Sequence, residues 1–144
     1  MVTTQLLHKD YFSTGDEVGG YTLLEIIGGG GEGAVWSAWD PKNERIVAMK
    51  FFKLDQTAID HEKRKQDLAN LATLEHDNIR EVYEVGTGTG FVFFVMRYFP
   101  FGSLSEQIDK NKLTIEQILM IAAQVTAALS YIHSRKVVHR DLKP

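Results

Sequence analysis

The sequence lacks several features that would direct it to particular classes of protein. None of its 144 residues is cysteine, which excludes a disulfide framework and thiolate metal sites and favours a reducing compartment. A formal net charge of −3 provides no broad basic surface, which argues against nucleic acid as the main partner. No apolar run approaches the roughly 20 residues needed to span a bilayer. The first ten residues, MVTTQLLHKD, lack the basic start and apolar run of a signal peptide, so we expect a soluble cytoplasmic domain.

The chain contains enough apolar material for one ordinary α+β domain, with 44% hydrophobic and 24% charged residues. Residues 1–20 are expected to form a loosely held lead-in. Five later runs are rich in strand-forming residues and are separated by turn signals, which predicts a five-stranded antiparallel sheet. The five runs span residues 21–27, 34–39, 45–52, 78–86 and 91–99.

Two segments have helical spacing. Within residues 57–75, Asp67, Leu71 and Leu74 recur at i, i+4 and i+7 and share one narrow face. Residues 114–133 carry a continuous apolar stripe, which predicts a long amphipathic helix. The stripe consists of Ile115, Ile118, Leu119, Ala122, Val125, Leu129 and Ile132.

A glycine-rich stretch joins the first two predicted strands. Gly28, Gly30 and Gly33 fit the pattern G-x-G-x-x-G, which dinucleotide-binding folds share. Those folds require a helix after the glycines, whereas residues 34–39 are typical of a strand. A phosphate-binding P-loop would require Gly-Lys-Ser/Thr, which is absent. Two interpretations stay open: a glycine hairpin whose backbone approaches phosphates, and a flexible surface turn.

Lys50 ends the run Val47-Ala48-Met49-Lys50 in a strand that we expect to be largely buried. Buried lysines are uncommon unless they are paired, and a phosphate and a carboxylate would supply the opposite charge. The alternative is a lysine that extends to solvent from the end of a strand.

A third motif, Val-His-Arg-Asp-Leu-Lys-Pro at 138–144, follows the long amphipathic helix. Together the motifs resemble the eukaryotic-type (Hanks-type) serine/threonine protein kinases. The matching segments occur in the order GGGGEGAV, VAMK, HDNI, FVMRYFPFGSL and HRDLKP, and the resemblance covers residues 21–144. It implies a kinase N-lobe at 21–98, made of the sheet and one helix. Residues 99–144 would form the hinge and an incomplete helical C-lobe that ends in the catalytic loop.

The resemblance also implies a role for individual residues in binding ATP. The glycine loop would cover the phosphates, Lys50 would hold the α- and β-phosphates, and Val35 and Ala48 would enclose the adenine ring. Met96 matches the gatekeeper, the backbone of Arg97 and Phe99 would bond the adenine edge, and Ser103 would lie near the ribose. The implied nucleotide-binding set is Ile27, Gly28, Gly29, Gly30, Gly31, Gly33, Val35, Ala48, Lys50, Asp67, Met96, Arg97, Phe99 and Ser103.

The implied catalytic set is Lys50, Asp141 and Lys143. Asp141 matches the aspartate that orients the hydroxyl of a protein Ser/Thr substrate and accepts its proton. Lys143 matches the serine/threonine class, in which it neutralises the transferring phosphoryl group.

The sequence departs from the kinase pattern at three points. Asp67, nine residues before His76, stands where the family has a glutamate that pairs with the strand lysine, and Glu32 places a carboxylate at the loop tip. The chain also ends at Pro144, before the two Mg²⁺ ligands of the family, so we predict no metal site in these residues.

Two functions stay open: the N-terminal portion of a serine/threonine kinase that is inactive by itself, and a non-catalytic, pseudokinase-like module that binds nucleotide or a partner. Because the stripe on the long helix would lack its usual cover, we also expect the chain to self-associate.

Overall fold

The computed structural model describes residues 11–30, 33–53, 66, 69–110, 113–139 and 142. The chain divides into two compact units, which are described separately below. The first contains Met1–Thr73 and Glu81–Tyr98, and the second contains Leu74–Arg80 and Phe99–Pro144. The N-lobe predicted from the sequence ran without interruption from 21 to 98, whereas the segment 74–80 belongs to the second unit.

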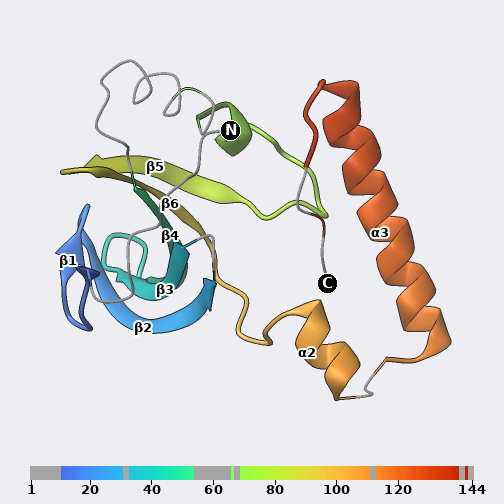
Figure 1. The fold of residues 1–144 in the computed structure, drawn as a ribbon, viewed down its shortest axis with the longest axis horizontal. Coiled ribbons are helices and arrows are strands. Elements are labelled where there is room, and N and C mark those ends of the chain that lie inside the picture. The colour runs from blue at the N-terminus through green and yellow to red at the C-terminus, as the bar shows by residue number, and fades with distance from the viewer. Residues whose placement is uncertain are drawn as a thin grey trace. The chain divides into compact units, whose positions relative to one another are not determined.

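The first unit is built on one antiparallel sheet of six strands in the order β1-β2-β3-β4-β6-β5 (Figure 1). All five predicted strands are present, and the sixth, β1, was missed because two residues show no periodicity. The predicted run 78–86 begins as a strand only at Val82, since residues 74–80 form turns in the other unit. The strands are β1 (Glu17–Val18), β2 (Tyr21–Gly30), β3 (Gly33–Asp40), β4 (Arg45–Lys53), β5 (Val82–Gly88) and β6 (Phe91–Arg97).

Strand alternation divides the apolar side chains of β4 and β6 between the two faces of the sheet. On β4, Val47, Met49 and Phe51 are completely buried in the larger cluster, which defines the core face. Ala48 points the other way and belongs to a smaller cluster with Val92, Phe94 and Met96, which defines the second face. The core-face cluster contains Val18, Leu23, Ala34, Trp36, Ala38, Val47, Met49, Phe51, Phe91, Phe93 and Val95.

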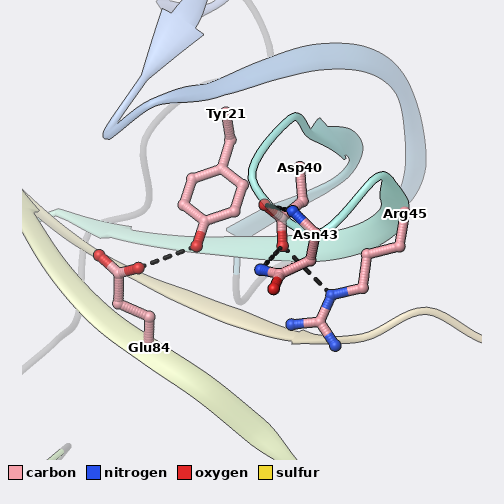
Figure 2. A network of polar contacts seen from close by, with 5 residues as sticks. All are labelled: Tyr21, Asp40, Asn43, Arg45 and Glu84. Atoms are coloured by element: carbon pink, nitrogen blue, oxygen red, sulfur yellow. Dashed lines mark hydrogen bonds and ion pairs between the residues drawn. The ribbon is translucent and has the colours of Figure 1, made fainter.

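The sheet curls, and a polar contact joins β2, near one edge of the sheet, to β5 at the other edge. The hydroxyl of Tyr21 on β2 donates to Oε2 of Glu84 on β5 at 2.8 Å (Figure 2). The guanidinium of Arg45 lies 3.7 Å from the centroid of the Tyr83 ring, also on β5. Because β5 is the last strand and β2 the second, these contacts hold the curl closed around the core face.

The turn between β3 and β4 is organised by the buried carboxylate of Asp40. It accepts hydrogen bonds from the backbone N–H of Asn43 at 3.2 Å, from its side-chain amide at 2.8 Å and from Nε of Arg45 at 3.2 Å (Figure 2). The hydrogen bond from the side-chain amide of Asn43 is the main reason why the pKa of Asp40 lies below its ordinary value. A buried carboxylate with three donors stays charged, and it orients Arg45 toward Tyr83.

Residues 11–16 contact the sheet and residues 17–18 form β1, although the sequence placed both in a loosely held lead-in. Gly15 N donates to Leu23 O at 2.8 Å, and Leu23 N donates to Asp16 O at 2.9 Å. The centroid of the Phe12 ring lies 4.5 Å from that of the Phe51 ring and 5.3 Å from that of the Phe91 ring. This segment therefore contributes an aromatic side chain to the core.

A glycine on β5 makes room for a large core side chain. The ring of Phe93 lies over Gly86, its cross-strand partner, where an added Cβ would collide with the ring atoms. The same ring lies against Gly19, which has a φ of +61°. Glycine is required at both places by close approach of an aromatic ring.

The second unit contains two helices, α2 (Leu104–Asp109) and α3 (Ile115–Ser134). The predicted helix at 114–133 is confirmed, and a capping box explains where it begins: Gln117 N donates to Thr114 Oγ1, and Thr114 N donates to Gln117 Oε1. The segment 74–80 is held to α3, because Glu75 N donates to the Tyr131 hydroxyl oxygen at 3.1 Å.

Of the helix predicted at 57–75, the structure describes residues 66 and 69–75, and Asp67 lies outside the described residues. Residues 66 and 69–72 are helical, whereas 73–75 are not, so the predicted end at 75 is wrong by three residues. The predicted stripe on α3 is exposed at its start, with Ile115 70% and Leu119 65% exposed, and becomes buried at Ile132. Contrary to the sequence expectation, α3 is long and apolar enough to cross a membrane. Core helices of soluble proteins share this length and composition, so the finding assigns no membrane role.

We predict that Tyr21→Phe opens the curl of the sheet by removing its bond to Glu84. The free energy of unfolding should fall by about 1 kcal/mol at pH 8, the net value of such a bond. Burial, followed by the bond to Glu84, raises the pKa of Tyr21 from 10.0 to about 12. The folded parent thus keeps a proton that the unfolded chain loses, and its stability should decline between pH 10 and 12.

Chemical denaturation of both proteins from pH 8 to 12 measures these effects. The variant should lack the component of the alkaline decline that arises from Tyr21. Equal stability at pH 8 would show that the Tyr21–Glu84 bond does not hold the curl.

Candidate nucleotide-binding site

The register of the sheet aligns the predicted site residues in two neighbouring rows. In one row, Gly28 on β2 pairs with Val35 on β3, and Val35 pairs with Lys50 on β4. In the other row, Ala48 on β4 pairs with Met96 on β6. Directly opposed side chains in an antiparallel sheet have Cβ atoms about 5 Å apart. Five residues chosen from motifs in different parts of the sequence therefore lie together on the second face.

The row of Ala48 forms an apolar floor. Ala48 is completely buried, Met96 is 6% exposed, and Val35 packs against the same cluster. Ala48 and Met96 are thus almost fully covered within the protein, and the half-buried Val35 is the member of this group that exposes part of its apolar surface.

The glycine-rich stretch is a hairpin, as predicted, in which Gly30 pairs with Gly33. The strand β3 begins directly at Gly33, so the dinucleotide-binding interpretation is wrong. Gly31 lies outside the described residues, while Gly29 forms part of β2 and pairs with Ala34. The register shifts between Ile26 and Gly28, so Ile27 between them has no cross-strand partner, and its side chain is 38% exposed.

Gly28 is not required by the packing of the protein. A Cβ added there would meet Val35 Cβ at 3.6 Å, an ordinary van der Waals contact, and the backbone is outside the left-handed region. A residue with a side chain would therefore fit the described structure. The absence of a side chain leaves space directly beside Val35 and in the row of Lys50.

Lys50 is half-buried, and its ammonium lies near an aromatic ring. Nζ is 5.2 Å from the centroid of the Phe52 ring, within the range of a cation–π interaction. The cross-strand neighbours of Lys50 are Val35 and Phe94. The ion pair expected between Lys50 and Asp67 stays a prediction, because Asp67 lies outside the described residues.

The hinge residues of the predicted set are engaged in contacts within the protein. On the first unit, Arg97 N donates to Glu81 O at 3.0 Å, so an adenine contact at this residue would use its carbonyl oxygen. On the second unit, the ring of Phe99 lies 4.9 Å from the Arg80 guanidinium, and burial lowers the pKa of Arg80. Ser103 is the N-cap of α2, and its hydroxyl oxygen accepts from Glu106 N at 3.3 Å.

The catalytic residues Asp141 and Lys143 lie outside the described residues, which leaves Lys50 as the described member of that set. The sequence did not single out Phe52. The available signal was its position two residues after Lys50, which places both side chains on one face of a strand. The contact with the ammonium depends on side-chain direction, which this spacing does not specify.

The comparison with known families agrees with this geometry. The model of the protein kinase domain matches residues 21–144. This chain belongs to the protein kinase domain family.

Its relatives include serine/threonine kinases from distant organisms. Mitogen-activated protein kinase pmk-2 of Caenorhabditis elegans is 37% identical over 132 residues, which cover 86% of this chain and 31% of the relative. Serine/threonine-protein kinase PrkC of Bacillus subtilis is 34% identical over 130 residues, covering 88% of this chain and 20% of the relative. The chain thus spans less than a third of the length of these two proteins.

A solved structure confirms the kinase fold. The kinase domain of PknI from Mycobacterium tuberculosis superimposes with a TM-score of 0.76 and 26% sequence identity. The similarity covers 92% of this chain and 55% of the PknI chain.

We predict that Ser103 acts chiefly as a helix cap. Ser103→Ala should destabilise α2 by about 1 kcal/mol, because Glu106 N loses its acceptor. Ser103→Asp should restore the stability, since aspartate is an equally good N-cap. Amide hydrogen exchange across residues 104–109 measures the local effect. Unchanged exchange together with weaker nucleotide binding in Ser103→Ala would instead assign the hydroxyl to the ribose.

Proposed function

We propose that this chain binds ATP on the second face of its sheet, beneath the glycine hairpin. It would form the nucleotide-binding part of a serine/threonine protein kinase that transfers the γ-phosphoryl group to a protein Ser/Thr hydroxyl. The observation that carries the proposal is the alignment of Gly28, Val35 and Lys50 in one row, beside Ala48 and Met96 in the next.

The two rows match the two chemical ends of a nucleotide. The half-buried Val35, beside the covered side chains of Ala48 and Met96, would provide apolar surface for the adenine base. Lys50 lies two residues further along β4, about 7 Å away, and its long side chain carries a positive charge for the phosphates. The open space beside Gly28 would let phosphate oxygens approach the backbone N–H groups of the hairpin. A flexible surface turn, the alternative for the glycines, would not require the lysine to share their row.

The catalytic step is proposed from the HRDLKP motif. Asp141 would orient the substrate hydroxyl and accept its proton, and Lys143 would neutralise charge on the transferring phosphoryl group. In the described part of the chain, no three His, Cys, Asp or Glu side chains gather as a metal site. Kinases use Mg²⁺ with ATP, and the ligands expected for it in this family follow the HRDLKP motif.

The second candidate is a non-catalytic module that binds nucleotide or a partner. Asp67 in place of the usual glutamate favours it, whereas the presence of Lys50, Asp141 and Lys143 favours the kinase. A cytoplasmic location is proposed on the absence of cysteine alone.

We predict that Lys50→Met weakens ATP binding by about tenfold or more, because a charged hydrogen bond to phosphate is lost while the apolar stem is kept. Lys53→Met, on the same strand, is the matched control and should bind ATP as the parent does. Titration calorimetry measures the affinity, and thermal melting shows whether each variant is folded. Equal affinity in the parent and in Lys50→Met would contradict the phosphate role, and an equal loss in both variants would indicate general charge attraction.

We also predict self-association of the chain through the exposed start of the stripe on α3, with a second copy covering Ile115, Ile118 and Leu119. Sedimentation equilibrium at several micromolar concentrations should show a mass that rises with concentration. Leu119→Gln keeps helix propensity and should reduce the association. A monomer over the whole range would contradict the prediction.

A further inference from the structure

We propose that Phe52 is a positioning residue whose ring holds the Lys50 ammonium ready for the phosphates of a bound nucleotide. The proposal rests on the phosphate role of Lys50 and adds a residue to it. The alternative is that Phe52 merely fills apolar space on the second face.

The contact follows from the geometry of β4. Residues 50 and 52 lie on the same face because side chains alternate along a strand. The ammonium lies 5.2 Å from the ring centroid, where the negative face of an aromatic ring attracts a cation. The Phe52 ring is thus one partner of the Lys50 charge.

A second aromatic ring holds Phe52 in its orientation. Phe94 on β6, the cross-strand partner of Lys50, meets Phe52 edge-on, with centroids 5.3 Å apart and an interplanar angle of 71°. This is a favoured arrangement for two aromatic rings. Phe52 also packs against the cluster of Ala48, Val92, Phe94 and Met96, so its position is supported from several sides.

The direction of the contact agrees with the phosphate role. Ala48 pairs with Ser37, and Lys50 pairs with Val35, so β3 approaches the glycine hairpin at Gly33 as β4 continues toward Phe52. Phe52 therefore lies nearer than Lys50 to the end of the sheet where the hairpin turns. This is the end at which the glycine backbone is placed to meet phosphates.

A ring suits this task because it holds the charge without supplying a strong hydrogen-bond acceptor. The ammonium has three N–H donors, and contact with the ring does not itself compete with phosphate oxygens for them. Lysine is otherwise a flexible four-carbon chain, so restricting it before the nucleotide arrives lowers the cost of binding.

The test uses the whole 144-residue chain, ADP as the probe and three variants. Phe52→Leu keeps apolar volume but removes the ring, Phe52→Tyr keeps the ring, and Tyr83→Leu removes the comparable Arg45–Tyr83 contact on the core face. Phe52→Leu should bind ADP about two- to fivefold more weakly, the effect of a partly exposed cation–π contact. Phe52→Tyr and Tyr83→Leu should bind ADP as the parent does.

The spectroscopic readout is the NMR shift of the Lys50 ε-methylene protons in the nucleotide-free chain, assigned by comparison with Lys50→Met. In the parent and in Phe52→Tyr the ring current should move these protons upfield, and in Phe52→Leu the displacement should disappear. Its absence in the parent would overturn the proposed contact. If Phe52→Leu loses the upfield displacement but binds ADP as tightly as the parent, the positioning role is wrong. It is also wrong if Tyr83→Leu weakens ADP binding as much as Phe52→Leu does.

The two proposals fail in different ways. If Lys50→Met binds ADP as tightly as the parent, the phosphate role fails and the positioning role with it, even where the ring-current shift is present. If Lys50→Met weakens binding and Phe52→Leu does not, the phosphate role stands and the inference about Phe52 is wrong.

Discussion

The register of β4 is the constraint on which the rest of the first unit depends. Met49 and Phe51 are completely buried on the core face, and the period of two then places Lys50 on the opposite face. A slip of one residue would exchange the faces and bury the lysine charge among aromatic rings, at a prohibitive desolvation cost. Apolar packing on one side of the sheet thus holds a charge in place on the other, without any contact to the charge itself.

The curl of the sheet is closed by contacts that lie at the end of β2 opposite to the glycine hairpin. The hairpin strand β2 carries Tyr21 at its other end, where the tyrosine hydroxyl reaches Glu84 on β5. Asp40, with its three donors, orders the turn that delivers Arg45 to the Tyr83 ring. These contacts lie on the core face, away from the row of Lys50.

Local patterns predicted the strands and named most of the candidate site, because both depend on spacing along the chain. Gly28, Val35 and Lys50 were identified from three short motifs, and the structure places them in one row. The two-residue strand β1 was missed, since it is formed by pairing with β2 and not by its own periodicity. The late start of β5 was also missed, because a contact with Tyr131 on α3 holds the preceding segment in the other unit.

The amino-acid sequence alone determined the membership of this chain in the kinase family, the order of its elements and the identity of the strand lysine. These properties depend on short motifs and on the spacing of residues along the chain, so they can be predicted without coordinates. Tertiary structure alone decided that Phe52 lies beneath the Lys50 ammonium with Phe94 edge-on to it, and that Tyr21 meets Glu84. Such contacts depend on side-chain directions and on the curl of the sheet, which arise only when strands distant in the chain pack together.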